Sequence, residues 1–221
     1  MSSIFVVIPY RDRPVALKTL LQQLLRYSNL KIIICEQEAG ESFNRGWLKN
    51  VGFILSGAAG FDTVYFHDVD TIPGPKFVGY KESCHSVQHL YGHTHTLGGI
   101  VAVPAHLFIG ANGFTNQLAS WGGEDRLLYN ALQPHVRRPH WTARFSDNSR
   151  VYEINEDGII EDMRHFRARV EKHLQERRAQ DLQNIDDRGD LSTTLFILQA
   201  ELPTSHPCIR HFVVGKKTVM V

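Results

Sequence analysis

The first seventy residues alternate between short apolar runs and longer segments with helical spacing. The runs at 4–8 (IFVVI), 31–35 (KIIIC) and 63–67 (TVYFH) are largely apolar and rich in β-branched and aromatic residues. Continuous runs of this length are typical of strands that are buried on both faces, as in a parallel sheet. The segments 14–25 and 43–55 repeat apolar residues every three or four positions, which predicts two helices. The pattern is therefore βαβαβ.

Beyond residue 70 the pattern is less regular. Residues 71–97 are rich in histidine and turn-forming residues, so we expect loop and irregular structure there. An amphipathic helix is predicted at 125–132, and the charged segment 166–183 predicts an exposed helix. Short elements are also expected as strands at 100–103, 193–202 and 211–214 and as a helical turn at 104–109. No repeat or linker divides the chain, which favours one domain over residues 1–221.

The composition indicates a folded protein and limits its partners. Of the 221 residues 43% are hydrophobic and 21% charged, and the net charge of +1 gives no sign of nucleic acid as a partner. No apolar run reaches the roughly 18 residues of an integral membrane segment, and the start of the chain lacks the features of a signal peptide. Three cysteines without a CxxC pattern favour a reducing compartment. We therefore expect a cytoplasmic protein.

Charged residues directly follow two of the predicted strands. Arg11 and Arg13 come after the first strand, and Asp68-Val69-Asp70 comes after the third. Ligands of parallel α/β sheets bind beyond the carboxyl ends of the strands, so both segments are expected to face one site. Paired carboxylates can hold a hard divalent cation with a diphosphate, and guanidinium groups bind phosphate or uracil oxygens. The alternative is that these are ordinary surface charges in turns.

Two further segments combine aromatic and charged residues. Phe43-Asn44-Arg45 offers a ring to stack on a base and another cation, unless Phe43 simply begins a helix in the core. In WGGED, Trp121 can pack against a sugar ring, and two glycines permit close backbone approach. Glu124 and Asp125 then begin a helix, whose dipole favours negative charge at that end. The alternative is an ordinary helix N-terminus with acidic residues in its first turn.

Six motifs occur in order and at suitable separations: PYRDR, FNRGWLKNVGF, FHDVDTIP, LGGIVAVPAHLF, NGF and WGGED. Together they resemble the β-1,4-galactosyltransferase family, including its N-acetylgalactosaminyl and xylosylprotein-acceptor relatives, over about residues 4–166. The resemblance implies a glycosyltransferase A-type (GT-A) α/β fold, with a Rossmann-like, mostly parallel central sheet flanked by helices. Residues 1–70 would form its nucleotide-binding half and residues 71–221 its acceptor and metal half. The resemblance does not extend to the stem and membrane anchor of the animal Golgi enzymes, so we expect a soluble form of bacterial or viral origin.

The activity that the resemblance implies is an inverting transfer of galactose or N-acetylgalactosamine from a UDP-sugar to a glycan or glycoconjugate hydroxyl. Asp125 would be the general base, with Glu124 as the second catalytic residue, and Trp121 and Arg126 would join Asp125 at the acceptor. An inverting transfer needs such a base, because the acceptor hydroxyl loses its proton as it attacks. The residues carried over to the donor are Pro9, Tyr10, Arg11, Arg13, Phe43, Arg45, Asp68, Val69, Gly98, Gly99 and Trp121.

The resemblance also implies Mn²⁺, with Mg²⁺ as an alternative, held by Asp70 and a late Met-x-x-His pair. Here the matching segment is DMRH, so His165 takes the histidine position, and Asp162 rather than Met163 lies three residues earlier. A carboxylate is a harder ligand than a thioether and suits either ion. The predicted ligands are therefore Asp70, His165 and Asp162. The alternative for His165 is a surface position in a charged helix.

Two departures from the family pattern bear on specificity. Arg126 follows Glu124-Asp125, where the galactosyltransferases carry another acidic residue tied to acceptor binding, so the acceptor is not expected to be simple N-acetylglucosamine. Thr96 stands where galactose-specific members place a bulky tyrosine. The smaller side chain leaves room for an N-acetyl group. We therefore hypothesise that the donor is UDP-N-acetylgalactosamine, or both that sugar nucleotide and UDP-galactose.

Two other functions would use the same residues. A metal phosphohydrolase could cleave sugar nucleotides, and a catalytically inactive module could bind a UDP-sugar or glycan without transfer. The aromatic acceptor platform argues against the first, and the joint presence of Asp70, Glu124 and Asp125 argues against the second. A zinc site is a minor alternative, because Tyr91-Gly92 interrupts any helix that would align the nearby histidines. That segment is better interpreted as a loop that closes over the donor. The histidines concerned are His85, His89, His93 and His95.

Overall fold

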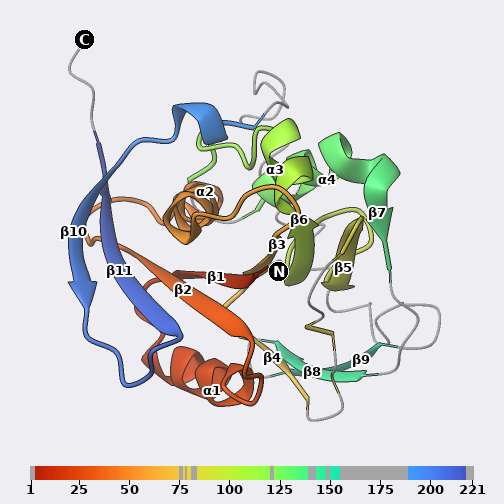
Figure 1. Cartoon of the computed structure of the whole chain (residues 1–221), viewed down its shortest axis with the longest axis horizontal. Helices are drawn as coiled ribbons and strands as arrows, with labels where there is room; N and C mark the ends of the chain where they lie inside the picture. The colour runs from red at the N-terminus through yellow and green to blue at the C-terminus, as the bar shows by residue number, and fades with distance from the viewer. Residues whose placement is uncertain are drawn as a thin grey trace.

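The computed structural model describes residues 3–74, 77, 79–80, 84–119, 122–138, 143–147, 150–154 and 189–217. Most of them are organised around one large sheet, in the order β10-β11-β2-β1-β3-β6-β5-β7 (Figure 1). Its strands are β1 (Ile4–Tyr10), β2 (Leu30–Gln37), β3 (Thr63–His67), β5 (Val87–Tyr91), β6 (Ile100–Pro104), β7 (Val136–Arg137), β10 (Phe196–Leu202) and β11 (Ile209–Lys216). A smaller sheet joins β4 (Thr71–Pro73), β8 (Ala143–Asp147) and β9 (Arg150–Ile154).

Strand β1 lies near the centre of the large sheet and pairs in parallel with both β2 and β3. Strand β11 extends this parallel set beyond β2. On the other side β6 runs antiparallel to β3, and β5 runs antiparallel to β6. The predicted βαβαβ order and the mostly parallel sheet are therefore confirmed. The carboxyl ends of β1 and β3 lie at the same edge, where their charged residues follow.

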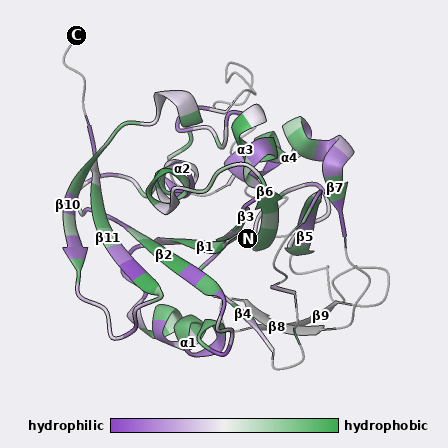
Figure 2. Ribbon diagram, viewed as in Figure 1, coloured by the Kyte–Doolittle hydropathy of each residue, from purple (hydrophilic) through white to green (hydrophobic). Residues whose placement is uncertain are grey.

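Helices cover both faces of the sheet. The helix α1 lies on one face, and α2, α3 and α4 lie on the other (Figure 1). Val6 and Ile8 of β1 pack in the layer of α1, whereas Val7 packs in the layer of α2. A strand covered on both faces must be apolar at every position, which explains its continuous apolar run and the green centre of Figure 2. The helices are α1 (Pro14–Leu24), α2 (Arg45–Ser56), α3 (Ala105–Gly110) and α4 (Glu124–Leu132), with 3₁₀ turns at Gln133–His135 and Leu191–Thr193.

Asn44 fixes the start of α2 and with it the position of Arg45. Its side-chain oxygen accepts a hydrogen bond from the backbone N–H of Trp47 at 2.9 Å, which is a standard N-cap. Its backbone N–H donates to the Gln37 side chain at 2.8 Å, and its amide donates to the carbonyl of Asn116 at 2.6 Å. The buried cap therefore ties the first turn of α2 to the end of β2 and to a distant loop.

Several expected boundaries need correction. The expectation of loop throughout 71–97 is wrong, because β4 and β5 form there. Strand β5 exists through antiparallel pairing with β6, a contact that a local pattern does not reveal. The second helix begins at Arg45 rather than residue 43, and β1 continues through Tyr10. The helix expected at 166–183 lies outside the described residues.

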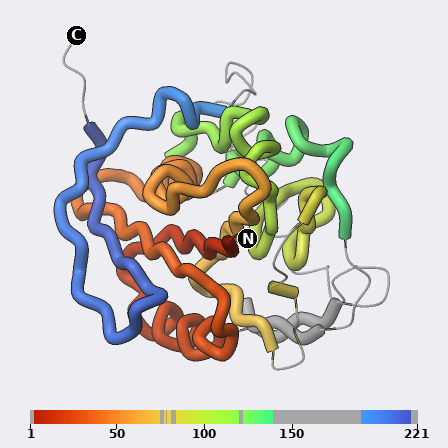
Figure 3. The backbone as a smooth tube through the Cα atoms, in the orientation of Figure 1, coloured from red at the N-terminus to blue at the C-terminus, as the bar shows by residue number. Residues whose placement is uncertain are grey.

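The C-terminal segment completes the sheet at the edge beside β2, where β10 is outermost (Figure 3). Both late strands are therefore confirmed, with starts shifted to Phe196 and Ile209. Within the described ranges, no helix combines the length and the apolar character that a membrane span requires.

Candidate active site

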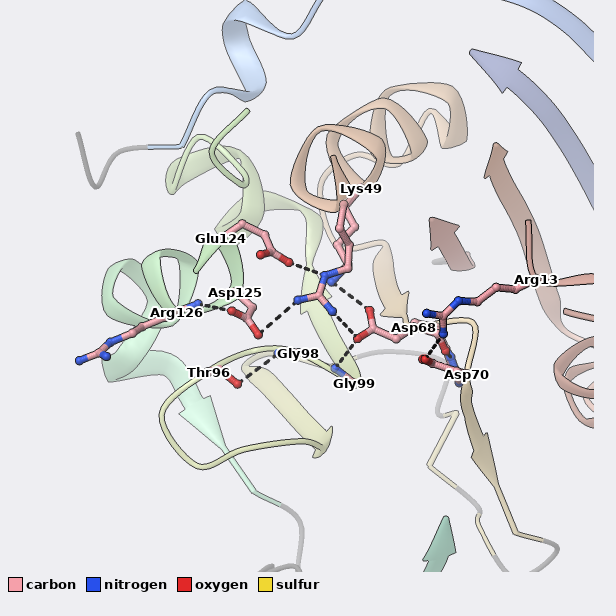
Figure 4. A network of polar contacts seen from close by, with 12 residues as sticks. Arg13, Lys49, Asp68, Asp70, Thr96, Gly98, Gly99, Glu124, Asp125 and Arg126 are labelled. Atoms are coloured by element: carbon pink, nitrogen blue, oxygen red, sulfur yellow. Dashed lines mark hydrogen bonds and ion pairs between the residues drawn. The ribbon is translucent and has the colours of Figure 1, made fainter. Parts of the chain in front are cut away.

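Four segments converge at the carboxyl edge of the sheet. Asp68 follows β3, and Glu124 and Asp125 open α4 (Figure 4). Arg45 opens α2. The turn at Gly98–Gly99 leads into β6 and lies directly beside them. The sheet topology thus joins residues that are far apart in the sequence into one cluster.

The Arg45 guanidinium is the centre of this cluster. Its Nε donates to Glu124 Oε1 at 2.5 Å and its Nη1 donates to Asp68 Oδ2 at 2.9 Å. Its Nη2 lies 3.6 Å from Asp125 Oδ2, which is an ion pair without a close hydrogen bond. The planar Arg45 cation therefore links Glu124 and Asp125 of α4 to Asp68 at the end of β3.

Asp68 connects that cation to the glycine turn. Its Oδ2 also accepts the backbone N–H of Gly99 at 3.1 Å, and its own backbone N–H donates to the Gly99 carbonyl at 2.9 Å. Burial would raise the pKa of Asp68, but the charges of Arg45 and Lys49 outweigh burial and hold that pKa well below its usual range. The carboxylate is therefore ionised and fixed in place.

The two acidic residues that open α4 have opposite electrostatic character. Glu124 is 1% exposed, and although burial would raise its pKa, the contact with Arg45 lowers it. For Asp125, burial and the neighbouring charge of Glu124 raise the pKa above its usual value. Asp125 is therefore the better proton acceptor, and Glu124 serves to hold Arg45.

Gly98 makes room for the Asp125 carboxylate. A Cβ atom added at Gly98 would lie 2.6 Å from Asp125 Oδ2, a separation that forces one of the two to move. The other carboxylate oxygen, Oδ1, accepts the backbone N–H of Arg126 at 2.9 Å. In Figure 4 the Arg126 side chain points away from the cluster, so Arg126 contacts Asp125 through its backbone N–H.

A second charged group lies at the end of β1. Arg13 Nη1 is 2.5 Å from Asp70 Oδ2, so the structure brings a predicted phosphate ligand together with the predicted metal ligand. Arg11 lies over the Phe43 ring at 5.2 Å and donates to the carbonyl of Glu41 at 2.6 Å. These residues therefore form a charged and aromatic rim beside the buried cluster.

The other residues predicted to bind the sugar donor include two in β1 and one shortly after β3. Pro9 and Tyr10 lie within β1, and the Tyr10 ring packs edge-on against His211, with 5.9 Å between ring centroids. Val69 is buried in the apolar layer of α1. Trp121, Asp162 and His165 lie outside the described residues, so their roles stay predictions. Among the described residues, no group of three or more His, Cys, Asp or Glu is arranged to hold a metal.

The structure adds one residue that the sequence analysis missed and gives another a different role. Lys49 is completely buried beside Asp68, and His89 of the zinc alternative is 1% exposed. His89 Nε2 donates to the carbonyl of Gly98 at 2.9 Å, while its Nδ1 accepts a hydrogen bond from Arg138 at 2.5 Å. His89 thus supports the glycine turn rather than a zinc site. The sequence pattern contains no signal for Lys49, because it lies away from the apolar stripe of the predicted helix and is buried only through tertiary contacts.

The buried side chains of His67 and His89 are expected to make the folding stability sensitive to acid. Burial lowers the pKa of His67 to about 4 and that of His89 to about 3, compared with about 6.5 in an unfolded chain. Below pH 6.5 the unfolded chain therefore binds more protons than the folded chain. We expect the free energy of unfolding to fall as the pH drops from 6.5 towards 5, by up to about 1.4 kcal/mol per pH unit for each histidine.

Urea unfolding at pH 7.5, 6.5, 5.8 and 5 would measure this loss. His89→Gln should flatten the dependence, and His206→Gln, at an exposed position, should not alter it. The raised pKa of Asp125 acts in the opposite direction, so the difference between the two variants is the decisive quantity. Equal slopes in both variants would contradict the prediction.

Comparison with known proteins identifies the family of this chain. The family model of the N-terminal region of glycosyl transferase group 7 matches residues 1–84, and the model of the N-terminal domain of galactosyltransferase matches residues 81–146. The catalytic domain of Drosophila β1,4-galactosyltransferase 7 in complex with xylobiose superposes with a TM-score of 0.72 at 20% identity, over 99% of this chain and 96% of that one. A mutant of that enzyme with manganese, UDP-Gal and xylobiose gives 0.70 at 19% identity, over the same shares.

Curated relatives agree with this placement. Human β-1,4-galactosyltransferase 4 is 30% identical over 178 residues, which are 70% of this chain and 52% of the relative. Mouse β-1,4-galactosyltransferase 5 is 33% identical over 143 residues, which are 58% of this chain and 37% of the relative. The fold is that of the GT-A glycosyltransferases, as expected. The chain belongs to the β-1,4-galactosyltransferase family.

This membership corrects one expectation. The chain spans about half the length of the curated relatives it matches, or less. Those relatives are galactosyltransferases of the Golgi, which contradicts the expected cytoplasmic location. That expectation rested on the start of the chain, on the lack of a long apolar run and on the cysteine pattern, and a sequence that covers only part of its relatives does not carry the information that sets location.

Proposed function

We propose that this chain is an inverting, metal-dependent glycosyltransferase that moves galactose or N-acetylgalactosamine from a UDP-sugar to a glycan hydroxyl. The observation that carries the proposal is the position of Asp125. Its carboxylate has a raised pKa, lies against the Gly98 turn and is linked through Arg45 to Asp68 at the end of β3. Family membership and the UDP-Gal complex of the Drosophila relative support the same activity.

Asp125 acts on the acceptor in this mechanism. It accepts the hydroxyl proton as the acceptor oxygen forms a bond to the anomeric carbon of the donor sugar. The bond from that carbon to the β-phosphate oxygen breaks, and UDP leaves with the electron pair. Because attack comes from the face opposite UDP, the configuration at this carbon inverts. Glu124 takes no proton, since its ion pair with Arg45 favours the charged form.

The first 70 residues supply the nucleotide side of the site in this proposal, and residues 71–221 supply the acceptor and metal side. Arg11 and Arg13 at the end of β1 would bind the diphosphate, and Phe43 would contact the uridine. Gly98 and Gly99 would form the wall beside the transferred sugar, because they expose backbone without side chains. Trp121 would contact both sugars.

The cation would be Mn²⁺, or Mg²⁺, held by Asp70 with Asp162 and His165. Asp70 fits this role, because a partly exposed carboxylate at a strand end is a hard oxygen ligand, and its charge is already matched to a cation, Arg13. When bound, the metal supplies stabilisation of the negative charge on the departing diphosphate. The manganese in the complex of the Drosophila relative supports this proposal.

Thr96 would set the donor preference. Its hydroxyl accepts the backbone N–H of Gly98 at 3.5 Å and donates to the carbonyl of His93 at 3.3 Å, so the side chain lies at the sugar wall (Figure 4). We expect the chain to use UDP-N-acetylgalactosamine and UDP-galactose. Thr96→Tyr should lower kcat/KM for the N-acetylated donor by about tenfold or more and spare UDP-galactose, because the larger ring occupies the space of the N-acetyl group.

A donor-by-acceptor screen with Mn²⁺ tests the proposal. Both donors are offered with xylobiose, with an N-acetylglucosamine glycoside and with acidic glycans, and product formation is compared with UDP-sugar hydrolysis without acceptor. Arg126 leads us to expect poor transfer to N-acetylglucosamine. Strict selectivity for galactose would overturn the donor assignment. Rapid hydrolysis without transfer, or no binding of UDP with Mn²⁺, would overturn the proposed function itself.

A further inference from the structure

Lys49 is a buried cation next to the proposed site. It lies one helical turn after Arg45 on α2, and its residue exposure is 0%. Its Nζ lies 3.3 Å from Asp68 Oδ1 and 5.0 Å from the centroid of the Phe114 ring. Lysine is almost never fully buried unless it is paired, because an isolated buried charge is costly. Such a residue calls for an explanation that packing alone does not give.

The charge balance of the cluster supplies that explanation. In the described part of the chain, the cluster contains the carboxylates of Asp68, Glu124 and Asp125 and the cations Arg45 and Lys49. Arg45 reaches all three carboxylates but contacts only one oxygen of Asp68. The other oxygen faces Lys49. Without Lys49, three buried carboxylates would share one cation, which is strongly unfavourable in a site of low dielectric.

Two cations on one face of α2, Arg45 and Lys49, pair with Asp68. Asp68 Oδ2 also accepts a hydrogen bond from the Gly99 N–H at 3.1 Å. We propose that Lys49 is a positioning residue for sugar transfer: it fixes Asp68 against the glycine turn and supplies the second positive charge that keeps Asp125 able to accept a proton. Lys49 acts through Asp68 and through its charge, and it does not contact the substrate. The inference rests on the proposed function, because it concerns the same reaction.

The surroundings of Asp125 define the expected effect. In the described structure, the charges that act on Asp125 are Glu124 on its own helix, Arg45 and Lys49 on α2, and Asp68 after β3. The two acids raise the pKa of Asp125 and the two cations lower it. Removing Lys49 therefore raises this pKa further, so the base is protonated and inactive up to a higher pH.

The experiment compares Lys49→Met, which keeps an unbranched side chain without the charge, with Lys18→Met, at an exposed position of α1. The full chain is assayed with UDP-galactose, Mn²⁺ and the best acceptor from the screen, and kcat/KM is measured across pH. We expect the acid limb of the Lys49→Met profile to move upwards by about one pH unit, with the maximum reduced less than tenfold. Lys18→Met should retain the limb of the unchanged chain.

A double variant separates charge from packing. Lys49→Met with Asp68→Asn removes one charge of each sign, so the remaining cluster has the same net charge as the original. Its acid limb should return towards the original pH even if its maximal rate is lower, and it should fold even if Lys49→Met alone does not. A limb that stays in place in Lys49→Met, or that fails to return in the double variant, would overturn the inference. Absence of transfer by the unchanged chain would instead contradict the proposed function.

Discussion

Asp125→Asn is expected to lower kcat for sugar transfer by about 10²- to 10⁴-fold, the usual contribution of a general base. Asparagine keeps the shape of the side chain, and its oxygen can still accept the Arg126 N–H, but it cannot take the acceptor proton. UDP is bound by other residues in the proposed site. Its affinity in the presence of Mn²⁺, measured by calorimetry, should therefore remain close to that of the unchanged chain.

The matched control for this variant is Glu201→Gln, which also neutralises a carboxylate but lies at an exposed position of β10. It should leave kcat unchanged. Glu124→Gln gives a second comparison, because it weakens the link to Arg45 rather than removing the base. Asp125→Asn that retains activity within tenfold of the unchanged chain would rule out Asp125 as the base.

Arg45→Met is expected to produce the largest loss of stability. Arg45 forms ion pairs with Glu124, Asp68 and Asp125, and its side chain is only 15% exposed. Removing one partner of a buried ion pair leaves an uncompensated charge, which costs about 3–5 kcal/mol of folding free energy. Urea unfolding at pH 7.5 measures this loss as a lower midpoint with an unchanged m-value.

The control for Arg45→Met is Arg210→Met. Arg210 also pairs with a carboxylate, that of Glu201 at 2.9 Å, but about half of its side chain is exposed to water. Exposed ion pairs contribute little because water and salt screen them, so the midpoint should barely move. Equal midpoints for Arg45→Met and Arg210→Met would show that the buried cluster is not held together by Arg45.

The first half of the fold was predictable because its strands are buried on both faces. Val6, Val7 and Ile8 are all apolar, since successive side chains enter different layers of the core. Strand β5 was not predictable in this way. Its residues include Gln88 and His89, and it depends on β6, which follows it only after a turn.

The candidate site was predictable in outline for a different reason. Parallel strands that end at one edge bring the residues after β1 and β3 together, as the contact between Arg13 and Asp70 shows. The roles of Glu124 and Asp125 came from the family resemblance, since their spacing alone fits any acidic helix start. Burial of Lys49 could not be predicted, because it depends on Asp68 lying over the same face of α2.

The pairing of β11 with β2 has a consequence for synthesis. Ile209 pairs with Ile32, so the apolar run of β2 acquires its outer neighbour only after about 170 further residues have been synthesised. Until then the emerging β2 presents unpaired backbone N–H and C=O groups at a hydrophobic border, where another copy could attach. Pairing of the β10–β11 hairpin with β2 therefore covers a strand border that is otherwise open to a second copy.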